Sequence, residues 1–183
     1  MSSLVSVIIT TKNESAVIKR LLASLRNQSY KNIEIILIDN NSSDSTKEKA
    51  YRFTNKVYNF GPERSAQRNF GAKIGKGDFL LFLDADMELS EKVIKESVNS
   101  INSSMKYAGV IIPEKSVSKT FWERVKAFER SFYNEKGDEI TDAARFFRKS
   151  VFKKAGGYDE TITGPEDWDL PETIKKLGYT FGR

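Results

Sequence analysis

The sequence predicts an α/β fold in which a mostly parallel central sheet is flanked by helices within a single domain. Short apolar runs alternate along the chain with segments whose apolar residues recur at helical spacing, as successive βαβ units require. Several runs are almost continuously apolar, which is typical of parallel strands that are covered on both faces. With 183 residues the chain has the length of one ordinary domain and can bury a substantial core.

The first half of the chain contains four apolar runs that predict strands, at 4–9, 33–38, 56–60 and 79–83. A helix is expected after each of the first three. The first carries its apolar residues on one face and has Asn13 as its expected N-cap. The second follows Asp44, and the third spans about 63–74 before a glycine stop at 75–77. Right-handed crossovers then make the four strands parallel.

The second half is expected to continue with a helix near 90–102, strands near 108–112 and 143–148, a turn at 156–157 and a helix entered within 165–177. A long amphipathic segment lies at 119–133, where aromatic residues alternate with basic ones. It fits a helix packed on its own domain or one that contacts a membrane surface. The last residues, 178–183, look like the opening of another strand, so we expect the natural chain to continue past Arg183.

Composition excludes several kinds of chemistry. The sequence contains no cysteine, which excludes disulfides and thiolate catalysis, and no histidine, which leaves carboxylates to act as metal ligands or general bases. A net charge of +5 suits an anionic ligand or membrane surface, but a solvated surface explains it equally well, and nucleic-acid binding is not expected. No apolar stretch approaches the ~20 residues of a membrane span, so a cytoplasmic protein is expected.

The segment FLLFLDADME, residues 79–88, ends an apolar run in Asp84 and Asp86. The carboxyl ends of interior parallel strands are where open α/β sheets bind ligands. If the extended backbone persists through Ala85, both carboxylates project to the same side, and such like charges repel unless a cation lies between them. Taken alone, the strand allows a turn, a phosphatase or a metal site.

Three polar loops fall at the carboxyl ends of predicted strands, at 10–14, 39–44 and 84–86, and should therefore converge in space. Each also has a purely structural interpretation: the first as a helix entry, the second as a polar turn with an N-cap. Further motifs make the set more specific. The segments GPERSAQRNFG at 61–71, GGYDE at 156–160 and GPEDWDL at 164–170 follow in chain order.

Together with VSVIITTKNE and IILIDNNSSDST, these motifs resemble family 2 glycosyltransferases with the GT-A fold, over nearly the whole chain. The resemblance implies a Rossmann-like sheet, with a nucleotide-binding half at about 1–88 and an acceptor-side half at about 89–183. It also implies inverting transfer of a sugar from a UDP- or GDP-linked donor, with Mn²⁺ or Mg²⁺ as cofactor. The acceptor is expected to be a saccharide, a lipid-linked molecule or a protein, and peripheral contact with the cytoplasmic face of the membrane is a further expectation.

The resemblance also implies roles for donor-side residues. Thr10 and Thr11 fall where the family binds the base, Glu14 lies near the ribose, and Asp39 can accept a hydrogen bond from a uracil or guanine N–H. Arg68, within the Gln-Arg-Asn counterpart of the family's Ala-Arg-Asn pattern, is expected to contact the nucleotide or diphosphate as a fixed cation. A solvated helix-face arginine is the structural alternative.

The metal ligand and the general base are both expected to be carboxylates. In the family the second aspartate of the Asp-x-Asp motif ligates the metal, which implies Asp86 as metal ligand and Asp84 as a contact to ribose or metal. The Glu-Asp motif assigns the base to Asp167, although a helix N-terminus also favours acidic residues there. The family's later histidine metal ligand has no counterpart here.

Two other functions fit parts of the pattern. One is a non-catalytic nucleotide-sugar-binding module, against which the presence of Asp84, Asp86 and Asp167 argues. The other is a phosphohydrolase of the haloacid-dehalogenase type, which also places Asp-x-Asp after an apolar strand. In that class a threonine normally follows the pair, whereas this chain continues with Met87.

Overall fold

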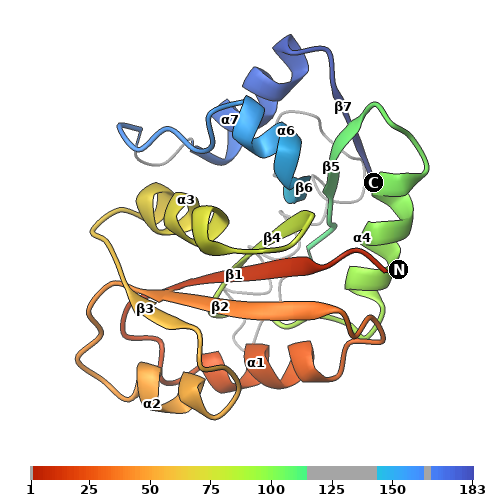
Figure 1. Ribbon diagram of the computed structural model, residues 1–183. Coiled ribbons are helices and arrows are strands. Elements are labelled where there is room, and N and C mark those ends of the chain that lie inside the picture. Colours follow the sequence, from red (N-terminus) through yellow and green to blue (C-terminus); the bar gives the residue numbers. More distant parts are fainter. Residues whose placement is uncertain (1, 115–143, 163–165) are drawn as a thin grey trace, which may run out of the picture.

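The structure is a computed structural model that describes residues 2–114, 144–162 and 166–183 (Figure 1). Within these residues, seven strands form one sheet in the order β3-β2-β1-β4-β6-β5-β7. The strands are β1 (Val5–Thr11), β2 (Ile33–Asp39), β3 (Val57–Asn59), β4 (Phe79–Asp84), β5 (Tyr107–Ile111), β6 (Ala144–Arg148) and β7 (Thr180–Gly182). The strands β1 to β4 are parallel, whereas β6 runs antiparallel to both β4 and β5.

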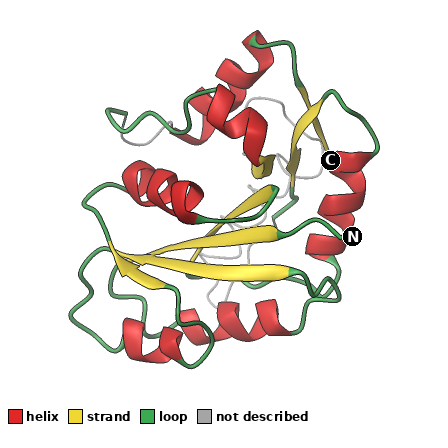
Figure 2. Ribbon diagram, in the orientation of Figure 1, coloured by secondary structure: helices red, strands yellow, loops and turns green. Residues whose placement is uncertain are grey.

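Helices cover both faces of the sheet (Figure 2). They are α1 (Ile18–Arg26), α2 (Thr46–Tyr51), α3 (Arg64–Ile74), α4 (Val93–Asn102), α6 (Lys149–Lys154) and α7 (Glu166–Lys176). The apolar residues of α1 and α4 join one core cluster, and those of α3, α6 and α7 join the other. Every residue of β1 is buried, because this central strand is covered on both faces.

Helix α3 lies close against β1 because Gly71 faces the strand. A Cβ atom at Gly71 would stand 2.4 Å from Cγ2 of Ile8, so only glycine fits at this distance. A Cβ atom at Gly77 would similarly meet backbone atoms of Ser6 and Leu4. Helix α3 ends at Ile74 with Gly75 as its C-cap, as the predicted glycine stop at 75–77 requires.

The predicted elements are present in order, with local corrections. Asn13 is not the N-cap of α1: the cap position is Val17, and Asn13 has a positive φ of 57°. Its side-chain Oδ1 instead accepts the N–H of Ser43 at 2.9 Å, because the loop after β1 is held by the loop after β2. Helix α6 was not predicted, since its six residues are too few to show a helical period.

The extended backbone does not persist through Ala85. Strand β4 ends at Asp84, and the N–H of Met87 donates to the carbonyl of Asp84 at 3.2 Å, which closes a turn. Asp84 and Asp86 are therefore not alternate residues of one strand, and the expectation based on an extended backbone through Ala85 is wrong.

The segment at 119–133 and the Gly164–Pro165 turn lie outside the described residues. Among the helices that the structure describes, none has the length and apolar character needed to cross a bilayer.

Candidate active site

The three polar loops converge at the carboxyl edge of the parallel strands, as the sequence predicts. The register pairs Thr11 of β1 with Asp39 of β2, and Thr10 of β1 with Asp84 of β4. These four residues therefore lie across three adjacent strands, although the sequence spreads them over more than seventy positions. The backbone alone assembles this edge, because parallel strands in register end together.

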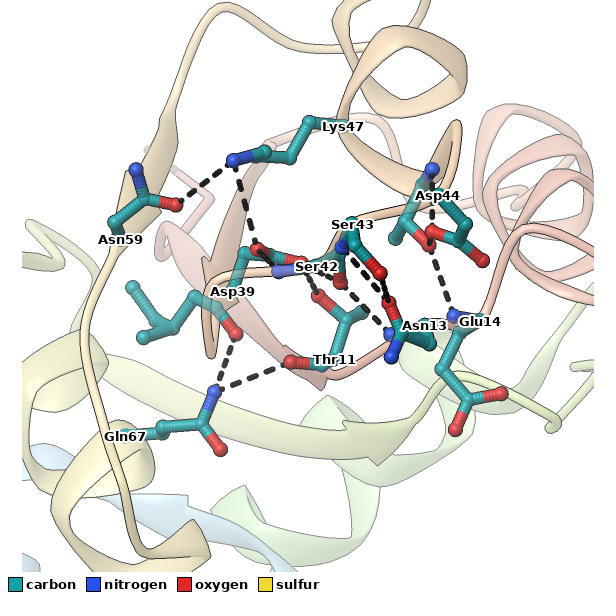
Figure 3. Close-up of polar contacts among 12 residues, drawn as sticks. Thr11, Asn13, Glu14, Asp39, Ser42, Ser43, Asp44, Lys47, Asn59 and Gln67 are labelled. Atoms are coloured by element: carbon teal, nitrogen blue, oxygen red, sulfur yellow. Dashed lines mark hydrogen bonds and ion pairs between the residues drawn. The ribbon is translucent and has the colours of Figure 1, made fainter.

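Asp39 is fully buried and anchors the loop that follows β2 (Figure 3). Its Oδ1 accepts hydrogen bonds from Oγ1 of Thr11 at 2.8 Å and from Oγ of Ser42 at 2.6 Å, and its Oδ2 accepts the N–H of Ser42 at 2.7 Å. The ammonium of Lys47 lies 4.0 Å from Oδ2. Three hydrogen bonds explain how a carboxylate is tolerated here, and they fix its orientation.

The loops after β1 and β2 are joined by side chains that cap backbone N–H groups (Figure 3). The N–H of Glu14 donates to Oγ1 of Thr46 at 2.8 Å, and the N–H of Ser15 donates to Oδ2 of Asp44 at 3.0 Å. The hydrogen bond from the Thr46 hydroxyl holds the pKa of Asp44 far below its usual range. On the other side, Nε2 of Gln67 donates to the carbonyl of Ile38 at 2.8 Å and so fastens α3 to the end of β2.

Glu14 places a further carboxylate near the Asp-x-Asp motif. Partial burial raises the pKa of Glu14, and the negative charges of Asp86, Asp44 and Asp84 raise it further. Four acidic side chains thus act on one region of the edge. Such a region favours a cation, because a cation relieves the repulsion among them.

Arg68 connects the donor-side edge with α7. Its side chain is only 2% exposed. Nη1 lies 2.6 Å from Oδ1 of Asp167, and Nη2 lies 3.4 Å from Oδ1 of Asp84. The ring of Tyr158 lies under the guanidinium, with 5.1 Å between Cζ and the ring centroid, and burial raises the pKa of this tyrosine. Arg68 is therefore an enclosed connector, and the alternative of a solvated helix-face arginine is wrong.

A second guanidinium, which the sequence analysis missed, reaches Asp84 from the other side. Nη1 of Arg145 lies 3.3 Å from Oδ2 of Asp84, and its Nε donates to Glu114. Arg145 stands at the start of β6, and the antiparallel register pairs Phe146 with Leu81. In an antiparallel pair, one strand begins at the edge of the sheet where the other strand ends. Recognising β6 as the partner of β4 would therefore have placed Arg145 near Asp84.

Asp86 has different surroundings from Asp84. Its side chain is exposed, and its backbone carbonyl accepts a hydrogen bond from Nη2 of Arg20 at 3.0 Å. Its carboxylate makes no hydrogen bond or ion pair with any residue in the described part of the chain. No set of three or more acidic residues in that part is arranged to hold a metal alone. Asp86 nevertheless fits a hard divalent cation that takes one or two protein carboxylates and completes its shell with phosphate and water.

The loop 156–160 is fastened to α3 beside Arg68. Nδ2 of Asn69 donates to the carbonyl of Tyr158 at 2.8 Å and to Oε1 of Glu160 at 2.8 Å, while Oδ1 accepts the N–H of Tyr158 at 2.9 Å. Both residues of the Arg-Asn pair thus hold the loop that precedes α7. Trp168, the neighbour of Asp167 on α7, is 51% exposed.

Comparisons with known proteins show the family of this chain and its fold. A model of glycosyl transferase family 2 matches residues 6–156. The GalNAc(5)-diNAcBac-PP-undecaprenol beta-1,3-glucosyltransferase of Campylobacter jejuni is 32% identical over 167 residues, which cover 82% of this chain and 52% of that protein. The UDP-Glc:alpha-D-GlcNAc-diphosphoundecaprenol beta-1,3-glucosyltransferase WfaP of Escherichia coli is 39% identical over 88 residues, which cover 45% of this chain and 35% of that protein.

A solved structure shares the fold over nearly the whole chain. The mannosyltransferase PcManGT of Pyrobaculum calidifontis, in complex with GDP-Man and Mn²⁺, matches with a TM-score of 0.75 at 19% identity, covering 99% of this chain and 54% of that one. The chain thus spans about half the length of the first relatives it matches. The predicted α/β, GT-A fold is confirmed. Because the family model matches most of its residues, the chain belongs to glycosyl transferase family 2.

Proposed function

We propose that this chain is the catalytic portion of a metal-dependent, inverting glycosyltransferase that moves a sugar from a UDP- or GDP-linked donor to an acceptor hydroxyl. One observation carries the proposal. Asp84, at the end of the strand that presents the Asp-x-Asp motif, and Asp167, on the helix of the Glu-Asp motif, meet at the guanidinium of Arg68. This shared contact supports the assignment of both motifs to one site.

The donor nucleotide is proposed to lie over the ends of β1 and β2. Thr10, Thr11 and Asp39 stand where a base would meet polar groups, and Glu14 stands where a ribose would follow. Asp39 already accepts hydrogen bonds from Thr11 and Ser42, so its first role is to fix the shape of this loop. A carboxylate can accept further hydrogen bonds, and a base N–H would be one of these donors.

A divalent cation, Mn²⁺ or Mg²⁺, is proposed to bind beside Asp86, where it would supply positive charge against the diphosphate that leaves. The surrounding residues fit this group by their chemistry, since Asp86 and Glu14 both offer hard carboxylate oxygens. Asp84 has both of its oxygens engaged by guanidinium groups, so we assign the metal to Asp86 and the ribose side to Asp84.

Asp167 is proposed to be the general base. In an inverting transfer the acceptor oxygen bonds to the anomeric carbon as the bond from that carbon to the diphosphate oxygen breaks, and the hydroxyl proton passes to the base. Asp167 is a quarter exposed and is oriented by Arg68, so it can face an acceptor while its position stays fixed.

The acceptor class is proposed from the relatives. The names of the Campylobacter and Escherichia proteins both describe transfer to undecaprenol-linked diphosphate acceptors. A lipid-linked saccharide is therefore the acceptor class we favour for this chain, which would act at the cytoplasmic face of a membrane. Protein and free saccharide acceptors follow as alternatives.

Isothermal titration calorimetry tests the donor. UDP, GDP and their sugars are titrated into the protein with and without Mn²⁺. We expect saturable, Mn²⁺-dependent binding of one nucleotide family and weaker binding of the other. Failure to bind any of these nucleotides in the presence of Mn²⁺ would overturn the proposal.

A further inference from the structure

Five side chains of alternating charge form a continuous chain across the candidate site. It runs from Asp167 on α7 through Arg68 on α3, Asp84 on β4 and Arg145 on β6 to Glu114 beyond β5. Every neighbouring pair in this chain is an ion pair. These ion pairs link the strand that ends in the Asp-x-Asp motif with β6 and α7, which follow it by about sixty residues or more in the sequence.

Asp84 lies at the centre of this chain and is held from two sides. Nη2 of Arg68 approaches Oδ1 at 3.4 Å, and Nη1 of Arg145 approaches Oδ2 at 3.3 Å. A carboxylate held at both oxygens by two planar guanidinium groups has little freedom to rotate. Arg145 is itself 12% exposed and fixed by Glu114, so it is a rigid support.

The charge of Arg145 also matters for an anionic ligand. Asp84 ends β4 and Asp86 lies in the turn that follows, so a donor diphosphate would enter beside two carboxylates. Because Arg68 also pairs with Asp167, it balances Asp84 only in part. Arg145 supplies the second positive charge, and it does so from the opposite side of the carboxylate.

We propose that Arg145 is a positioning residue for donor binding, which holds the carboxylate of Asp84 in the orientation that the ribose and diphosphate require. This inference rests on the proposed function, because it assumes a nucleotide sugar as ligand. It adds a residue from the acceptor-side half to the donor site. Arg145 acts through Asp84 and does not itself touch the donor.

The test is a double-mutant cycle measured as the Kd of the preferred nucleotide sugar in the presence of Mn²⁺. Arg145→Met should weaken binding about tenfold, as expected when one partner of a partly buried ion pair is removed, and Arg145→Lys should restore part of the affinity. In the Asp84→Asn background, Arg145→Met should change the Kd less than about twofold. Arg148→Met is the matched control, because Arg148 lies on the same strand but donates to the carbonyls of Ile101 and Tyr107.

Three results would overturn the inference, and they are distinguishable. An unchanged Kd in Arg145→Met means that the residue has no role in donor binding. Equal losses in the wild-type and Asp84→Asn backgrounds mean that Arg145 contacts the donor directly. A wild-type chain that binds no nucleotide removes the proposed function itself. Thermal unfolding of each variant shows whether it is folded, and Arg145→Lys carries the test if Arg145→Met is not.

Discussion

Asp84 and Asp86 are separated by one residue, yet their surroundings differ and indicate different roles. Asp84 is held between two guanidinium groups, whereas Asp86 is exposed and, among the described residues, is held through its backbone carbonyl. The turn that begins at Asp84 causes this difference, because it ends the strand alternation that would have aligned the two side chains. We infer that Asp86 is available to a cation and Asp84 is not.

This difference predicts the effect of removing each carboxylate. Asp86→Ala should lower the affinity for the nucleotide sugar in the presence of Mn²⁺ to the level measured without metal, because the cation loses its proposed protein ligand. Affinity measured without metal should stay within about twofold of wild type. Calorimetry with and without Mn²⁺ checks both values, and Glu91→Ala provides an exposed acidic control from the segment that follows this loop. Full Mn²⁺ dependence in Asp86→Ala would exclude Asp86 as the ligand.

The sequence predicts residues well where a motif and a strand end coincide. Thr11, Asp39 and Asp84 could be placed together because each closes an apolar run, and the observed register pairs these ends. Arg145 could not be placed, because its contact with Asp84 depends on β6 pairing with β4 across more than sixty residues. The enclosed position of Arg68 was hidden for the same reason, since Asp167 and Tyr158 approach it only in the folded chain.

At the scale of elements, the edge opposite the candidate site is fastened by Glu34 of β2. Its Oε1 accepts hydrogen bonds from Oγ of Ser6 at 2.6 Å and from the N–H of Gly77 at 3.2 Å, and its Oε2 pairs with Lys56. One buried carboxylate thus joins β1, β2 and the turn before β4. These are the strands whose opposite ends form the candidate site.

Glu34 makes the stability of this edge depend on pH. Burial alone would raise its pKa, but the hydrogen bonds from Lys56, Ser6 and the N–H of Lys76 outweigh burial and lower it below the ordinary value of 4.5. A lowered native pKa contributes stability that is present above the unfolded value and is lost as the pH falls through the native value. The contribution therefore exists at neutral pH and fades below about pH 4.5.

Glu34→Gln should consequently reduce the free energy of unfolding by about 1–3 kcal/mol at pH 7, the usual cost of leaving buried donors without a charged partner. The difference from wild type should shrink as the pH falls below 4.5. Urea unfolding from pH 3 to pH 7 measures it, with exposed Glu48→Gln as the control. A difference that stays constant over this range would show that charge plays no part.

Local signals also explain which elements the sequence predicts. Strands β1 and β4 were evident because their apolar runs reflect burial on both faces, and α1 was evident from its apolar face. Asn13 was misassigned because its residue type suits an N-cap, whereas tertiary hydrogen bonds to Ser42 and Ser43 place it in a loop. Side-chain preference is a weak guide where two loops hold each other.

At the scale of the whole molecule, the site lies where two kinds of sheet topology meet. The parallel strands β1 to β4 supply the proposed nucleotide-binding half, and β6 joins them in the antiparallel direction. The nearly continuous apolar runs and their βαβ order predicted the parallel half of the sheet directly. The order β4-β6-β5-β7 could not be predicted, because it depends on pairing between distant segments, and part of the chain between them lies outside the described residues.

We propose that this site transfers sugar with Asp167 as the general base. Release of the nucleoside diphosphate from the preferred nucleotide sugar, with Mn²⁺ and a lipid-linked saccharide acceptor, is measured in wild type and in Asp167→Asn. We predict that wild type turns over and that Asp167→Asn is slower by about 10²–10⁴-fold, the usual contribution of a general base, with donor binding within about twofold of wild type. Equal rates in the two proteins would contradict the claim, and so would a wild-type protein that binds donor but releases no nucleotide.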